Sequence, residues 1–204
     1  MNKLTNDQIR LLLEAGYETR TREYKPSFSW NNNEKSIWIK EKVTQAVLAM
    51  SNTRYGGQIV IGVIEGDGKR LVLSGLNKDE FNTFEDYDGI KGYIDGFSYT
   101  DSIFDISYGE HLSKMFVVLT IQEFNEIPLI CKKNGQTGVL RKDDIYVRSK
   151  KAPYSSIRAT EPELREVIHM VVDKEKSDLI SRNWIKKGVV NPDQFYKDQI
   201  KDLK

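Results

Sequence analysis

Residues 43–64, VTQAVLAMSNTRYGGQIVIGVI, decide the fold, because two different apolar patterns meet in this stretch. In its first part the apolar residues recur at helical spacing, which predicts a helix over residues 34–50 with one buried face. The segment SNTRYGG, residues 51–57, ends that helix. Residues 58–64 are then apolar without alternation, which is typical of a strand covered on both faces. The chain therefore passes from a half-buried helix directly into a fully buried strand.

The segment before this stretch predicts one helix and one strand. Thr5 and Gln8 have the spacing of a capping box, in which each side chain bonds the backbone N–H of the other residue. The helix that they begin stops at Gly16. A strand follows over residues 17–25 and ends at Pro26, which cannot donate a backbone hydrogen bond.

The segment after the stretch is richer in strands. Asn77 begins a third helical stretch that glycines interrupt, and a capping box of Thr160 and Glu163 begins a long helix to about Ser181. Further strands are expected over residues 71–73, 102–107, 115–121, 128–132 and 144–149. This order of elements predicts an α+β fold with a mixed, mainly antiparallel sheet flanked by helices.

Length and composition indicate an ordinary globular protein. The chain has 204 residues, 30% of them charged, and a net charge of +1. This length suits one domain, expected over residues 1–181, with a charged helical extension over residues 182–204. The single cysteine, Cys131, excludes a disulfide framework and fits a reducing compartment, so a cytoplasmic location is expected. No signal peptide is apparent, and the longest apolar run is too short to span a membrane.

Charge is unevenly distributed along the chain. From residue 141 to residue 158 only Asp143 and Asp144 oppose the basic residues, which are Arg141, Lys142, Arg148, Lys150, Lys151 and Arg158. Such a segment can form a basic rim that contacts phosphate, and it can equally be an ordinary solvated face.

A second charged segment, ETRTREYK at residues 18–25, holds two glutamates five positions apart. In a regular strand this odd separation would place Glu18 and Glu23 on opposite faces. They can converge only if the strand has a bulge, or if Glu18 precedes it. One interpretation is two solvated acids paired with nearby arginines. The other is a site for Mg²⁺ or Mn²⁺ that also uses Glu65 and Asp67, because clustered carboxylates stay ionised only around a cation.

Three motifs in order resemble the Schlafen/Alba-like domain family. They are ETRTREYK, then VTQAVLAMSNTRYGGQIVIGVIEGDG, then DIYVRSKKAPYSSIRATEPEL. Family members include DNA-binding proteins, ATP-binding proteins and endoribonucleases that act on transfer RNA and other structured RNA. In the nucleases three acids bind a divalent metal. The resemblance implies that a Schlafen-core-like lobe covers about residues 18–168.

Carried over residue by residue, the first two acids match Glu18 and Glu23. The third acid directly follows I-G-V in the family; here that position is Ile64, so Glu65 is the match and Asp67 the substitute. Lys25 matches a lysine that could hold a phosphate or neutralise developing charge. The resemblance thus implies that Glu18, Glu23, Glu65 and Lys25 are catalytic. Asn52 either ends its helix or orients the metal site. Glu23 is expected to be exposed and to contribute little to stability.

The resemblance implies a metal-dependent endoribonuclease, using Mg²⁺ or Mn²⁺, with a role in stress or antiviral defence. RNA is expected rather than DNA, and a homodimer is expected because family nucleases often clamp a duplex between two lobes. The residues expected to contact nucleic acid are Arg20, Arg22, Lys25, Arg54, Arg141, Lys142, Arg148, Lys150 and Lys151. The alternatives are a non-catalytic DNA- or RNA-binding module and a nucleotide-binding regulator; no G-x4-G-K-S/T pattern of a P-loop is present.

Overall fold

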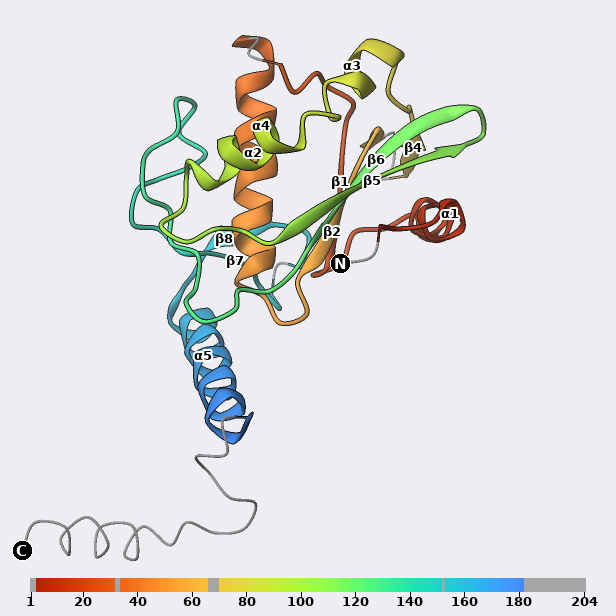
Figure 1. Ribbon diagram of the computed structural model, residues 1–204. Coiled ribbons are helices and arrows are strands. Elements are labelled where there is room, and N and C mark those ends of the chain that lie inside the picture. The colour runs from red at the N-terminus through yellow and green to blue at the C-terminus, as the bar shows by residue number, and fades with distance from the viewer. Residues whose placement is uncertain (1–2, 32–33, 66–69, 152, 182–204) are drawn as a thin grey trace, which may run out of the picture.

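The computed structural model describes residues 3–31, 34–65, 70–151 and 153–181 of the chain (Figure 1). The expected extension over residues 182–204 and the candidate ligand Asp67 lie outside these ranges.

The centre of the fold is a four-stranded sheet in the order β1-β2-β6-β5. Its strands are β1 (Arg22–Lys25), β2 (Gly57–Ile61), β6 (Lys114–Ile121) and β5 (Phe104–His111). β1 and β2 are parallel because helix α2 (Glu34–Ser51) crosses over between them, whereas the other two pairs are antiparallel. The prediction of an α+β fold with a mixed, mainly antiparallel sheet is confirmed.

The two faces of the sheet are covered by different helices. Val43 of α2 packs with Ile59 on one face. On the other face Ile9 of α1 (Asn6–Ala15) packs with Val60. Neighbouring residues of β2 thus enter separate apolar clusters, and the prediction of a strand covered on both faces is confirmed. α1 begins with the predicted capping box and ends at Gly16 in the left-handed conformation.

The predicted strand over residues 58–64 is two strands, because the backbone turns at Gly62. Its φ of 106° lies in a region that side-chain-bearing residues rarely adopt. Beyond it, β3 (Val63–Glu65) leaves the central sheet and pairs with β4 (Leu71–Leu73) in a separate antiparallel hairpin. The pairing places Ile64 opposite Val72.

β1 is shorter than the predicted strand over residues 17–25. The Thr19 N–H donates to the Arg22 carbonyl at 2.9 Å, and the Arg22 N–H donates back to the Thr19 carbonyl at 3.3 Å. This reciprocal pair closes a tight turn, so the chain reverses direction between Glu18 and Glu23.

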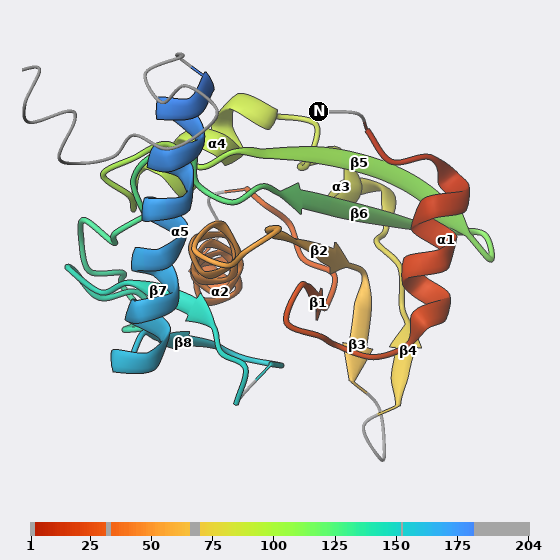
Figure 2. The same ribbon diagram turned by 90° about the horizontal axis from the view of Figure 1, so that it is seen from below.

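A second layer packs on the other side of α2, where Figure 2 shows the helix between the sheet and α5 (Glu161–Ser181). This layer also holds β7 (Tyr146–Arg148) and β8 (Ser156–Arg158), which form a short antiparallel hairpin. Leu48 of α2 shares an apolar cluster with Val167 of α5. The sequence did not predict β8, in which Ile157 is the only apolar residue of the three.

Two further segments differ from the predictions. The stretch that Asn77 caps contains two short helices, α3 (Lys78–Asn82) and α4 (Tyr87–Asp95). Residues 128–132 are not a strand; Cys131 makes only an isolated bridge to Ser98.

Asn52 explains how this non-strand segment is held. Its buried side-chain amide donates to the carbonyls of Leu129 and Tyr146 at 2.8 and 3.1 Å. Its amide oxygen accepts from the Leu129 N–H at 2.8 Å. These bonds replace those a neighbouring strand would make. Asn52 therefore joins the end of α2 to the segment before β7 and does not act at the acidic pair.

Candidate functional site

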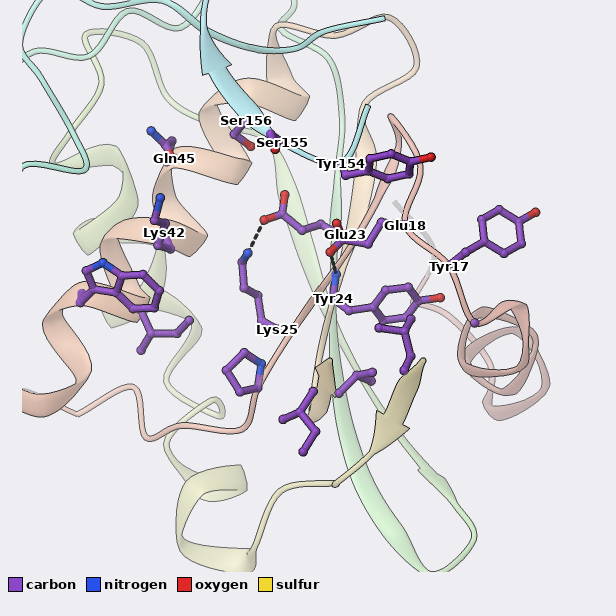
Figure 3. Close-up of a pocket in the computed structure, with 17 residues that line it drawn as sticks. Tyr17, Glu18, Glu23, Tyr24, Lys25, Lys42, Gln45, Tyr154, Ser155 and Ser156 are labelled. Atoms are coloured by element: carbon purple, nitrogen blue, oxygen red, sulfur yellow. Dashed lines mark hydrogen bonds and ion pairs between the residues drawn. The ribbon is translucent and has the colours of Figure 1, made fainter. Parts of the chain in front are cut away.

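The turn in the N-terminal segment brings the two glutamates to one place. A pocket of about 890 Å³ lies beside β1, and both Glu18 and Glu23 line it (Figure 3). Because Glu18 precedes the tight turn and Glu23 lies within β1, the alternation that would separate them does not apply. The second of the two conditions for their convergence is therefore met, because Glu18 precedes the strand.

Glu23 is bound by two cations. Its Oε2 accepts from Nη1 of Arg148 at 2.5 Å, and its Oε1 forms an ion pair with Nζ of Lys25. The residue is only 5% exposed. The expectation of an exposed glutamate is therefore wrong, because the β7 layer covers this side of β1 and places a buried arginine against it.

Arg148 donates to the backbone at three places. It donates to the carbonyls of Thr19 at 2.8 Å, of Arg20 at 3.3 Å and of Pro153 at 2.7 Å. Burial lowers the pKa of Arg148, and the negative charge of Glu23 partly opposes this shift. The predicted phosphate contact is not supported, since the side chain of Arg148 has no exposed surface. The residue instead clamps the turn before β1.

Glu18 caps the free edge of the sheet. β1 is an edge strand, and the Tyr24 N–H donates to Oε1 of Glu18 at 3.0 Å. Burial raises the pKa of Glu18, the bond from Tyr24 opposes the shift, and the charge of Glu23 adds to it. The carboxyl thus occupies a backbone donor that an unprotected edge would offer to another strand.

The carboxylate oxygens of Glu18 and Glu23, as they are placed, do not fit a divalent metal. Both oxygens of Glu23 already face cations, and burial favours the protonated form of Glu18. Ile64, at the position of the family's third acid, lines the pocket with an apolar side chain. Glu65 ends β3, and nothing is described of its side chain. Within the described ranges no three His, Cys, Asp or Glu side chains are grouped to hold a metal. A Mg²⁺ or Mn²⁺ site stays a prediction.

A second group of charged residues surrounds a hollow of about 460 Å³ at the start of α5. We call it the basic groove; its charged lining residues are Arg54, Lys150, Lys151, Arg165, Glu163 and Glu166, and His169 also lines it. Three of these, Arg54, Lys150 and Lys151, were predicted to contact nucleic acid. Arg165 and His169 were not, although their four-residue spacing places them on one face of a helix.

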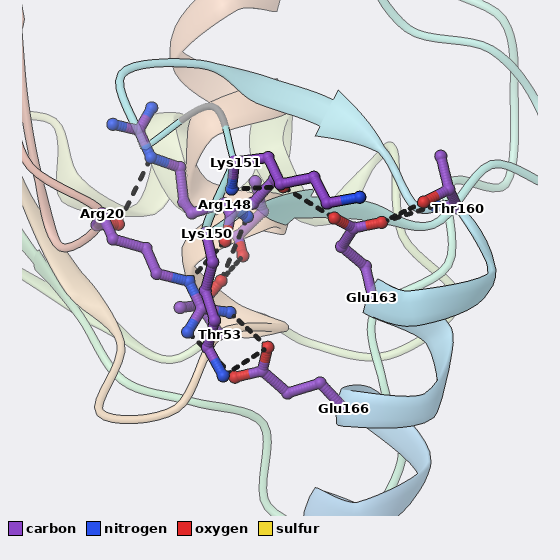
Figure 4. A network of polar contacts seen from close by, with 10 residues as sticks. Arg20, Thr53, Arg148, Lys150, Lys151, Thr160, Glu163 and Glu166 are labelled. Carbon is purple, nitrogen blue, oxygen red and sulfur yellow. Dashed lines mark hydrogen bonds and ion pairs between the residues drawn. The ribbon is translucent and has the colours of Figure 1, made fainter.

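The carboxylates of the basic groove are held by the protein itself (Figure 4). Nη1 and Nη2 of Arg20 donate hydrogen bonds to the two carboxylate oxygens of Glu166, at 2.9 and 2.7 Å. Glu163 accepts from the Ser149 hydroxyl at 2.6 Å and also from the Thr160 hydroxyl, and these bonds lower its pKa to about 2. The Thr160 N–H also donates to Glu163 at 3.2 Å, which is one of the two bonds of the predicted capping box.

The remaining predicted contacts lie apart. Arg20 joins the turn before β1 to α5, and Arg22 lies over the Tyr17 ring at 4.9 Å. Arg141 and Lys142 are exposed on the loop before β7 and line neither pocket. Lys25 is the one predicted cation that lines the pocket beside β1.

Comparison with known proteins identifies the family. The sequence model of the family described as Schlafen, AlbA_2 matches residues 18–153, and the chain belongs to this family. No curated protein matches the chain. Family membership supports a role related to nucleic acid. The search for membrane spans, made over the described residues, finds no helix long and apolar enough to cross a bilayer.

Two solved structures are similar to the chain. One is the DIP2311 protein from Corynebacterium diphtheriae, at 16% identity and a TM-score of 0.49, covering 79% of this chain and 27% of that one. The other is the N-terminal domain of a putative ATP-dependent DNA helicase RecG-related protein from Nitrosomonas europaea, at 16% identity and a TM-score of 0.45, covering 79% and 92%. The chain thus corresponds to about a quarter of the DIP2311 protein.

Proposed function

We propose that the protein binds nucleic acid through the basic groove, with Arg54, Lys150, Lys151 and Arg165 at the phosphates. The observation that carries the proposal is that these cations come from three separate segments and converge on one hollow. Arg54 follows α2, the two lysines follow β7, and Arg165 is on α5. A backbone of phosphates is the polyanion that such a cluster suits, and family membership supports a nucleic-acid role.

An incoming phosphate would have to displace Asp173 from Arg54, which it holds at 2.7 Å, but the other charges of the groove favour phosphate. Its two carboxylates are already engaged, Glu163 by hydroxyl groups and Glu166 by Arg20. Lys150 lies 3.6 Å from Glu166 but its side chain is 73% exposed. An exposed pair of this kind contributes at most about 1 kcal/mol, so a phosphate can compete for the lysine. Arg165 is 74% exposed, and its ion pair among the described residues is with Glu161 of its own helix.

Phosphate contacts of this kind predict a strong dependence on salt. Each contact to a duplex contributes about 0.9 to the slope of log affinity against log salt, because binding releases condensed counterions. The variant Lys150→Gln/Lys151→Gln should therefore lower the slope by about 1.8 for duplex and 1.4 for single strands. Fluorescence anisotropy with RNA and DNA of the same sequence, between about 50 and 300 mM salt, measures it.

A matched control removes the same charge elsewhere. Lys3 and Lys78 are exposed and lie outside both pockets, so Lys3→Gln/Lys78→Gln has the same net charge as the groove variant. The control should keep the wild-type slope. Equal slopes for the two double variants would remove the groove from the binding surface, because a general effect of net charge would then explain any loss.

Metal-dependent cleavage of structured RNA, such as transfer RNA, is the finer prediction from the sequence. One observation favours it, namely that Glu18 and Glu23 share a pocket. We propose binding as the primary function because both oxygens of Glu23 are held by cations. Incubating a transfer-RNA pool with the protein and Mg²⁺ or Mn²⁺ decides between the two. Intact RNA under conditions of measured binding supports a non-catalytic module, and defined metal-dependent fragments support the nuclease.

A further inference from the structure

The pocket beside β1 carries three exposed aromatic rings, of which Tyr17 has Arg22 over one face and Trp38 has Lys42 beside it. Tyr17, Trp38 and Tyr154 line it and are 62%, 55% and 64% exposed. They come from three places in the chain: the residue after the end of α1, the helix α2, and the loop between β7 and β8. Aromatic residues are usually buried or at an interface, so three exposed rings at one pocket indicate a surface that receives a partner.

Two lysines lie in the same pocket. Lys25 and Lys42 line it, on β1 and α2. Nζ of Lys42 is 5.8 Å from the centre of the Trp38 ring, so a cation and a flat apolar face are adjacent. Figure 3 places Lys42 on the α2 side and Tyr17 and Tyr154 on the other side, with Glu23 and Lys25 between them. This combination suits a ligand with a planar ring at one end and a negative charge at the other.

The two carboxyl groups of the pocket do not prevent a phosphate from entering. Glu23 is neutralised by Arg148 and Lys25. Glu18 accepts the Tyr24 N–H, and burial raises the pKa of its carboxyl. The repulsion of a phosphate is therefore weaker than two free carboxylates would produce.

We propose that this pocket holds one unpaired nucleotide of a bound strand, with its base against Tyr17 or Tyr154 and its phosphate at Lys25 and Lys42. The volume of about 890 Å³ lies within the range of about 300–1,000 Å³ that small-ligand sites occupy. The proposal rests on the nucleic-acid role, but its residues lie outside the basic groove. The pocket would select unpaired over paired nucleotides, whereas the groove contacts only phosphate.

The test compares two blunt-ended RNA duplexes with the same number of base pairs, one fully paired and one with a single-nucleotide bulge that carries 2-aminopurine. Wild type should prefer the bulged RNA by about tenfold, since stacking of one base on aromatic side chains is lost in the duplex. Binding should also change the 2-aminopurine fluorescence. Tyr154→Ala and Tyr17→Ala should lose the preference. Tyr99→Ala should keep it, because Tyr99 is 62% exposed but lies outside the pocket.

The outcomes separate the two proposals. Lys150→Gln/Lys151→Gln should weaken binding of both RNAs and keep the preference for the bulge. If Tyr154→Ala, Tyr17→Ala and Tyr99→Ala all prefer the bulged RNA over the duplex to the same degree, the pocket assignment is overturned. The proposal for the basic groove would still stand. The last measurement is the binding of free AMP to wild type and to Tyr154→Ala. Saturable AMP binding that Tyr154→Ala abolishes, without any preference for the bulge, would assign the pocket to free nucleotides and overturn the strand-bound form.

Discussion

The substitution Glu23→Gln should destabilise the fold strongly, although it changes few atoms. The variant keeps the shape of the side chain and one oxygen that can accept from Arg148. It removes the negative charge that faces a guanidinium with no exposed surface. A buried charge without a counter-ion is costly, whereas the loss of an exposed glutamate is nearly neutral. The size of the effect therefore measures how far the Glu23–Arg148 pair supports the structure.

The magnitude follows from the contacts that remain. Removing one partner of a buried ion pair costs about 3–5 kcal/mol. Here the guanidinium keeps its bonds to the carbonyls of Thr19, Arg20 and Pro153, so the lower end applies. We expect a loss of about 3 kcal/mol in the free energy of unfolding. For a domain of this size, each 1 kcal/mol lowers the melting temperature by about 2–4 °C, which gives a fall of about 6–12 °C.

Urea unfolding and thermal melting followed by circular dichroism measure the change. The matched control is Glu161→Gln, which removes a carboxylate that is 67% exposed and paired with Arg165. The control should stay within about 0.5 kcal/mol of wild type. If Glu23→Gln melts within about 2 °C of the control, a solvated acidic pair becomes the better account of this segment.

Three further predictions concern neighbouring groups. Burial raises the pKa of Glu18 above 4.5. The stabilisation from its protonated form is therefore complete below pH 4.5 and is lost as pH rises through the raised pKa. Glu18→Gln can still accept from the Tyr24 N–H, so it should be more stable than wild type in urea at pH 8. The pKa of Glu163 is lowered from 4.5 to about 2, so the stabilisation from its ionised form is complete above pH 4.5 and is lost as pH falls toward 2. In that window the free energy of unfolding of Glu163→Gln should depend less on pH than that of wild type. Parallel profiles for the two proteins would contradict this. Asn52→Ala leaves three buried backbone groups without partners and should cost about 2–4 kcal/mol in urea unfolding; a loss under 1 kcal/mol would show that water replaces the amide.

The contact between Glu23 and Arg148 joins two of the motifs that the chain shares with its family. Glu23 lies in ETRTREYK and Arg148 in DIYVRS, 125 positions apart. Each motif on its own reads as a charged surface segment. In the fold Glu23 and Arg148 form one buried ion pair. These two motif residues therefore hold the β7 layer against the edge of the sheet.

The sequence by itself determined the elements whose pattern is long and regular. The apolar spacing over residues 34–50 predicted α2, and the continuous apolar run after it predicted a strand covered on both faces. Both capping boxes were predicted from short polar patterns, because each depends only on residues within one helical turn. The three motifs also predicted the family, because short patterns that are weak singly become specific when they occur in order.

Only the tertiary structure decided what the charged residues do. Glu23, Arg20 and Arg148 have the composition of a solvated surface, yet the fold buries or pairs each of them. The break at Gly62 and the hydrogen bonds of Asn52 also depend on distant partners. Whether a charge is solvated or buried is set by residues more than a hundred positions away, and no local pattern in a chain contains that information.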